Sequence, residues 1–147
     1  MKQITLFAAL IFLGLTVGCK KDENKEATPQ ELIIGKWKAT TAVIGGSNVL
    51  VPTSTTKTEL EIEFRSDKTL AFNWTNTILT TNPPTVSKST LNGTYSWNGD
   101  ILTITAVNGS DTRTVTGPVV ISETEMVFTP TSGDTATFVS LLEAEKL

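Results

Sequence analysis

Apolar and polar side chains alternate one by one along most of this chain. The clearest run is 59–64, in which three glutamates alternate with leucine, isoleucine and phenylalanine. The chain also contains 27 threonines, and threonine is a β-branched residue that favours extended backbone. Because successive side chains of a strand point to opposite faces, this period-two pattern predicts strands with one packed face and one hydrated face.

The segments that carry the pattern predict about eight or nine short strands and no long helix. They are 37–44, 60–64, 70–74, 91–97, 101–104, 112–116, 119–122, 126–129 and 136–141. Asn98-Gly99 is the clearest turn, since these residues tolerate the positive φ angles of a tight hairpin. Only 29–34 and 141–147 could hold a short helical turn. The pattern predicts one all-β domain, an antiparallel barrel or sandwich.

The N-terminal segment has a different character. Lys2 is followed by an almost entirely apolar stretch, 4–17, and then by Gly18-Cys19 and a charged run. A basic start, a short apolar core and a small residue before the cleavage point predict a secretory signal peptide over residues 1–18. The apolar stretch is too short for a membrane-spanning helix, which needs roughly 20 apolar residues.

Leu15-Thr16-Val17-Gly18-Cys19 resembles the lipobox of bacterial lipoproteins, although Thr16 replaces the usual Leu, Val or Ile. The resemblance implies that Cys19 is lipidated and becomes the mature N-terminus, so that the protein is held to a membrane. The alternatives for Cys19 are a disulfide or a catalytic thiolate. It is the only cysteine, and the chain contains no histidine to activate a thiol, so both are excluded within this chain.

Residues 19–30 are charged and hold no large apolar side chain, which predicts a flexible tether between the lipid and the domain. Within it, Lys21-Asp22-Glu23 resembles the export signal of Bacteroidetes lipoproteins that reach the outer cell surface. A solvated spacer is the alternative. The expected location is the cell envelope, as an outer-membrane lipoprotein, and the export-signal interpretation adds exposure at the cell surface.

Removal of residues 1–18 takes away one basic side chain and leaves 129 residues with 11 basic and 15 acidic side chains. The resulting net charge is about −4, without a basic cluster. A mildly acidic surface of this kind argues against nucleic acid as a partner.

Gly35-Lys36-Trp37, at the start of the first predicted strand, resembles the Gly-X-Trp signature of lipocalins. More of the chain, roughly 32–141, resembles the lipocalin-like domain of Bacteroidetes lipoproteins, in the order 32–37, 60–64, 67–70, 91–97 and 101–105. The resemblance implies an antiparallel up-and-down barrel of about eight strands over residues 31–147, with Gly35 and Trp37 closing one end. A sandwich with the same strand order is the alternative.

Two departures from lipocalins matter. The chain has no Thr-Asp-Tyr motif, and its last strand has no arginine to stack on Trp37. Ligand residues of lipocalins are therefore not carried over to this chain.

The absence of histidine removes the commonest general base and metal ligand, which excludes His-dependent nucleophiles and the usual zinc sites. Glu59, Glu61 and Glu63 share one strand face and could offer oxygen ligands to Ca²⁺. The favoured alternative is that they are the hydrated face of an amphipathic strand. We expect no metal, no cofactor and no enzymatic activity.

The aromatic residues give the best indication of a binding site. Phe72, Trp74, Tyr95 and Trp97 are hypothesised to line a cavity mouth, while Trp37 packs the closed end. The alternative is that all five are core residues, since aromatic side chains dominate cores.

Two functions remain open. The preferred one is binding of a small apolar or amphipathic molecule in the barrel, and a cavity of several hundred cubic ångströms would favour it. The second is a protein-interaction module or inhibitor in an envelope assembly, which a packed interior with an exposed apolar patch would favour. Residues 75–88 are the longest strand-poor stretch and are expected to form a lid or contact loop.

Overall fold

The structure is a computed structural model that describes residues 27–135 and 137–147. The expected signal peptide, Cys19 and most of the expected tether lie outside the described residues. Within the described part, no helix combines the length and the apolar character that crossing a membrane would require.

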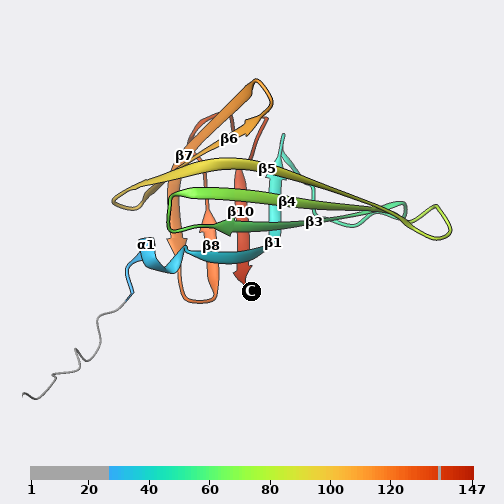
Figure 1. Ribbon diagram of the computed structural model, residues 1–147, viewed down its shortest axis with the longest axis horizontal. Coiled ribbons are helices and arrows are strands. Elements are labelled where there is room, and N and C mark those ends of the chain that lie inside the picture. The colour runs from blue at the N-terminus through green and yellow to red at the C-terminus, as the bar shows by residue number, and fades with distance from the viewer. Residues whose placement is uncertain (1–26, 136) are drawn as a thin grey trace, which may run out of the picture.

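Eight antiparallel strands form a closed barrel (Figure 1). They are β1 (Gly35–Ile44), β3 (Thr56–Phe64), β4 (Thr69–Ile78), β5 (Thr85–Asn98), β6 (Ile101–Asn108), β7 (Asp111–Ile121), β8 (Glu125–Phe128) and β10 (Leu141–Lys146). Each pairs with the next in this series, and β10 pairs with β1 to close the ring. The predicted up-and-down barrel of about eight strands is confirmed, and the sandwich alternative is wrong.

Three short elements accompany the barrel. They are α1 (Pro29–Leu32), β2 (Ser47–Asn48), which pairs with β1, and β9 (Ser132–Gly133), which pairs with β7. The short helical turn predicted near Pro29 is confirmed. Glu31 closes a capping box with Thr28, accepting a hydrogen bond from its backbone N–H at 2.8 Å.

The alternation of the sequence produces the core. In β3, for example, Leu60, Ile62 and Phe64 are buried, while Glu59 and Glu63 are partly exposed and Glu61 is exposed. Inward-facing side chains of every barrel strand pack together in this way. Those that are fully buried are Trp37, Ile62, Phe64, Leu70, Leu102, Ile104, Val115, Met126, Phe128 and Leu142, and Ile33, which follows α1, is fully buried with them.

The barrel has two different ends. The α1 end holds α1 and the turns 65–68, 99–100 and 122–124, and the far end holds 45–55, 79–84, 109–110 and 129–140. At the α1 end, the indole Nε1 of fully buried Trp37 donates to the Ile33 carbonyl at 2.7 Å. The Lys146 Nζ lies 5.3 Å from the centre of the Trp37 ring and donates to the Leu32 carbonyl at 2.8 Å. Lys146 of the last strand therefore covers Trp37 in the place where lipocalins have an arginine.

Residues 111–121 form one strand, so the prediction of two strands separated by Gly117-Pro118 is wrong. A Cβ at Gly117 would lie 2.3 Å from the Thr129 carbonyl oxygen. Glycine is therefore needed because another segment approaches closely, and not because the chain turns. The Asn98-Gly99 hairpin is present, but the turn itself is Gly99-Asp100, because Asn98 pairs with Ile101.

The predicted strand at 136–141 and the predicted helical turn at 141–147 are also wrong, because the last strand is Leu141–Lys146. Its leucine, glutamate, alanine and lysine residues favour helix intrinsically. Pairing with β1 on one side and β8 on the other decides the outcome instead, and Leu142 and Ala144 face the core.

The segment 75–88, expected as a lid or contact loop, is mostly strand. β4 continues to Ile78 and β5 begins at Thr85, so only 79–84 is loop. These strands run on beyond the rest of the barrel and form a projection on the right of Figure 1. We call this projection the arm; it consists of residues 56–59 of β3, 75–78 of β4, the loop 79–84 and 85–91 of β5.

Candidate ligand site

The four aromatic residues predicted to line a cavity mouth lie at two different ends of the barrel. Phe72 and Trp74 are on β4 toward the far end, where Phe72 is buried and Trp74 is partly buried. Tyr95 and Trp97 are on β5 beside the turns of the α1 end. The structure thus brings them together as two pairs, and of the four only Trp74 lines the hollow described below.

Tyr95 stabilises the turn between β3 and β4. Its hydroxyl donates to the Arg65 carbonyl at 2.7 Å, and its ring packs edge-on against Phe64 with a centroid distance of 5.1 Å. The Lys68 Nζ lies 5.2 Å from the centre of the same ring. Burial raises the pKa of the Tyr95 hydroxyl, and the nearby Asp67 carboxylate raises it further. These contacts indicate a structural role for Tyr95.

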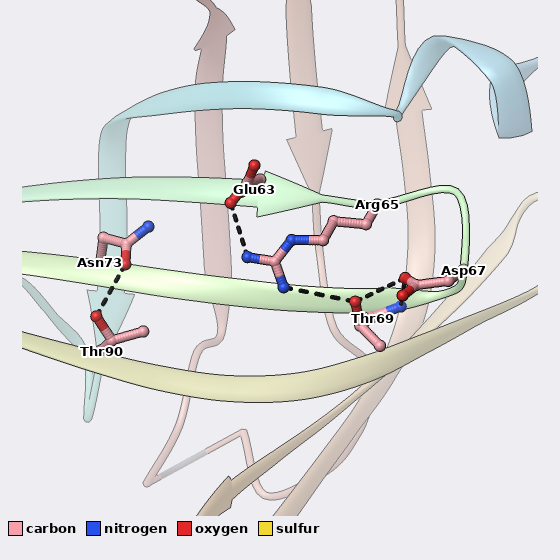
Figure 2. Close-up of polar contacts among 6 residues, drawn as sticks. All are labelled: Glu63, Arg65, Asp67, Thr69, Asn73 and Thr90. Carbon is pink, nitrogen blue, oxygen red and sulfur yellow. Dashed lines mark hydrogen bonds and ion pairs between the residues drawn. The ribbon is translucent and has the colours of Figure 1, made fainter.

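The same turn carries a chain of polar contacts on its outer surface (Figure 2). Arg65 donates to Glu63 at 2.8 Å and to the Thr69 hydroxyl at 3.5 Å. The hydroxyl and the backbone N–H of Thr69 donate to the Asp67 carboxylate at 2.6 and 2.9 Å, and these bonds lower the pKa of Asp67. Farther along the strands in Figure 2, Thr90 donates to Asn73 at 2.9 Å. These side chains hold neighbouring strands together and do not surround a ligand-sized space.

Changing Tyr95 to phenylalanine should lower the free energy of unfolding by about 0.5–1.5 kcal/mol, because the Arg65 carbonyl loses one of its two hydrogen bonds and keeps the one from the Lys68 N–H. The ring and its contact with Phe64 remain, so the core should keep its shape. Urea denaturation of both proteins measures the difference. A loss above about 3 kcal/mol, which is typical of cavity formation, would contradict a role limited to this hydrogen bond.

Trp97 is partly buried, and its Nε1–H donates to the Gly99 carbonyl in the β5–β6 turn. It packs against the edge of the core at the α1 end. Trp97 therefore contacts the turn of its own hairpin, whereas Tyr95 contacts the turn between β3 and β4.

A hollow of about 200 Å³ opens at the far end of the barrel. Residues from β4, β5, β6, β7 and the segment before β10 surround it: Trp74, Leu91, Ala106, Asn108, Asp111, Arg113, Thr137 and Phe138. Trp74, Leu91, Ala106 and Phe138 provide apolar surface, while the amide and the charged groups provide polar surface. An apolar wall with a few polar groups is the usual composition of a small-molecule site.

Arg113 holds one side of this hollow in place. Its Nε donates to the Asp111 carboxylate at 2.9 Å, and its Nη1 donates to the Thr137 carbonyl at 2.6 Å. The second bond joins β7 to the segment 134–140. Phe138 fixes the same segment from within, because its ring packs edge-on against Phe72 with a centroid distance of 5.4 Å.

Sequence reasoning missed Arg113 and Phe138, although Arg113 left a signal in the sequence. Val115, Gly117 and Val119 are the buried positions of β7, so Arg113 falls on the same inward face at the end of the strand. Lys146 falls likewise on the inward face of β10, in line with Leu142 and Ala144. Each end of the barrel therefore has one cationic residue on the otherwise apolar face of a strand. Arg113 lies beside Trp74 at the far end, and Lys146 lies over Trp37 at the α1 end.

The glutamates of β3 lie on its outer face, as favoured from the sequence. The Glu59 carboxylate forms ion pairs with Lys57 at 3.0 Å and with Lys38 at 3.8 Å, and Glu63 forms an ion pair with Arg65. In the described parts of the chain, no group of three or more carboxylates is arranged to hold a metal ion.

Comparison with known families agrees with this geometry. A family model described as a lipocalin-like domain matches residues 33–128, which is well over half of the chain. Searches of curated proteins and of solved structures gave no significant match. A lipocalin-like barrel indicates ligand binding in general. The chain belongs to the lipocalin-like domain family.

Proposed function

We propose that this protein is an outer-membrane lipoprotein of the Bacteroidetes type whose barrel binds a small apolar or amphipathic ligand without catalysis. The anchor would be lipidated Cys19, in the cell envelope and exposed at the surface. The lipobox-like residues 15–19 and the charged tether support the anchor. The observation that carries ligand binding is the hollow beside Trp74, at the end of the barrel that α1 does not close.

The size of the hollow limits what enters it. About 200 Å³ is smaller than the roughly 300–1,000 Å³ of sites that enclose a drug-sized ligand. The barrel interior is otherwise filled by side chains. A single ring or a short alkyl chain fits this space, with the polar part of the ligand near the Asp111–Arg113 pair.

The position of the hollow suits a tethered protein. The described chain begins beside α1 (Figure 1). The residues that surround the hollow lie at the opposite end of the barrel. A lipid attached before α1 would therefore be joined to the end of the barrel opposite the ligand site. Asp111, the carboxylate at the hollow, is ion-paired with Arg113, and the chain holds no histidine, which supports binding without catalysis.

The test uses the full lipoprotein in phospholipid nanodiscs with 5-fluorotryptophan at its three tryptophans. Titration with octanoate should shift the fluorine NMR signal of Trp74 in a saturable manner. The signals of Trp37 and Trp97 should stay fixed, because these residues lie at the α1 end. A shift confined to Trp97, or no saturable shift at all, would contradict a ligand site at the far end.

A pair of matched variants sharpens this test. Leu91→Asn places an amide in the apolar wall and should weaken octanoate binding about five- to tenfold, equivalent to about 1–1.4 kcal/mol. Val107→Asn introduces the same amide near the same end, but on the exposed outer face of β6, and should leave binding unchanged. Equal weakening in both variants would indicate a general loss of structure.

A further inference from the structure

The arm leaves one long strand edge without a neighbour. β5 pairs with β4 from Thr94 to Thr85, but its pairing with β6 begins only at Asn92. Residues 85–91 therefore have a strand on one side only, and residues 85–90 are exposed. This edge is part of the projection on the right of Figure 1, away from α1.

Two hydrogen bonds show which backbone groups on this edge are free. The N–H of Thr85 donates to the Thr81 hydroxyl at 2.8 Å, and the N–H of Tyr95 donates to the Lys68 carbonyl at 2.9 Å. Both partners lie on the β4 side. Since alternate residues of a strand direct their backbone groups to opposite sides, Val86, Lys88 and Thr90 direct theirs away from β4. No strand of the described chain pairs with these three residues on that side.

The opposite edge of the arm, formed by β3, is protected against pairing with another strand. The carbonyl of Thr56 in β3 accepts a bond from the Thr53 N–H at 2.9 Å, so the preceding segment folds back onto it. Lys57 and Glu59 place an ion pair on that edge. Proteins commonly protect edge strands with charges and covering segments, because a bare edge invites pairing with another chain. In this arm, only the β3 edge has both forms of protection.

The chemistry of the β5 edge indicates which strand could pair with it. Lys88 is the one charged residue in 85–91 and lies at the centre of the segment. Pairing with a second copy over the whole segment would place Lys88 directly opposite its equivalent, and like charges in that position are destabilising. A strand with a carboxylate opposite Lys88 would gain a favourable pair. Val86, which is 55 % exposed, offers an apolar contact next to it.

We propose that residues 85–91 of β5 bind an extended segment of another protein as an added antiparallel strand, with an acidic side chain of that segment opposite Lys88. Main-chain hydrogen bonds to Val86, Lys88 and Thr90 supply the binding energy, and Lys88 selects the partner. This interaction uses the outward backbone groups of Val86, Lys88 and Thr90, none of which lines the hollow, so it stands independently of the proposed ligand although Leu91 at the end of the segment borders the hollow.

The test uses the full lipoprotein in nanodiscs and a fluorescently labelled peptide, Thr-Val-Thr-Glu-Thr-Val-Thr. We expect the peptide to bind and to slow hydrogen exchange of the backbone N–H groups of Val86, Lys88 and Thr90. A peptide with lysine in place of glutamate should bind at least about fivefold more weakly, because it presents a like charge to Lys88. Slowed exchange elsewhere, or none at saturating peptide, would overturn the proposal.

Two substitutions separate the backbone and charge contributions. Lys88→Glu should reverse the preference between the two peptides, whereas Lys57→Glu on the opposite edge should leave it unchanged. Lys88→Pro removes an N–H that points away from β4, so the fold should survive while binding falls at least about tenfold. Undiminished binding to Lys88→Pro, or self-association of the unmodified protein through this edge, would overturn the proposal.

Discussion

Replacing Trp37 by alanine is expected to lower the free energy of unfolding by about 3–5 kcal/mol, because it removes the largest fully buried side chain of the barrel. The whole indole is buried, and closely packed cores relax only in part around a deleted side chain. Its Nε1–H also satisfies the Ile33 carbonyl, which connects α1 to the barrel. The substitution therefore leaves a cavity and an unpaired carbonyl at once.

Urea denaturation followed by circular dichroism measures this loss, and Trp97→Ala provides a matched control. Trp97 lies at the same end but is only partly buried, so its loss should be clearly smaller. Lys146→Met should cost about 1–2 kcal/mol, because the ammonium leaves both the indole and the Leu32 carbonyl, and only the part due to the indole should disappear in a Trp37→Ala background. A loss below about 1 kcal/mol for Trp37→Ala would mean that Trp37 does not close the barrel.

The sequence predicted a strand correctly wherever alternation of buried and exposed side chains is enough to define it. Leu60, Ile62 and Phe64 alternate with charged residues, and no other arrangement buries all three. Errors arose where contacts distant in sequence decide. Gly117-Pro118 resembles a break, but the glycine accommodates the approach of Thr129 from 12 residues farther on. β10 is composed of helix-favouring residues and becomes a strand only between β1 and β8.

The candidate site was predicted in part for a related reason. The inward direction of Phe72, Trp74, Tyr95 and Trp97 follows from alternation along β4 and β5. Their division between the two ends depends on strand register, since Phe72 pairs with Leu91 while Tyr95 pairs with Ile104. Register follows from the hydrophobic pattern and from the turns, and the position of the β4–β5 turn was not predicted because 75–88 was expected to be a loop. Phe138 was missed because contacts distant in sequence hold its segment at the hollow, namely its ring against Phe72 and the Arg113 bond to the Thr137 carbonyl.

This position of Phe138 leads to the second large effect. Its ring is buried at the edge of the hollow and covers Phe72. Changing Phe138 to alanine should lower the free energy of unfolding by about 3 kcal/mol or more, because an aromatic core contact is lost. It should also deepen the hollow toward Phe72, since apolar cavities of this kind stay dry and accept apolar ligands. Dodecanoate should then bind more tightly relative to octanoate than it does to the unmodified protein.

Phe64→Ala is the matched control for this prediction, because Phe64 is also buried and also packs edge-on against an aromatic ring, that of Tyr95. It lies at the α1 end, so its removal should cost a similar free energy of unfolding without changing the preference between the two fatty acids. Urea denaturation and fluorine NMR titration at Trp74 measure the two effects separately. Equal fatty-acid preference in both variants would show that Phe138 supports the core without limiting the depth of the ligand site.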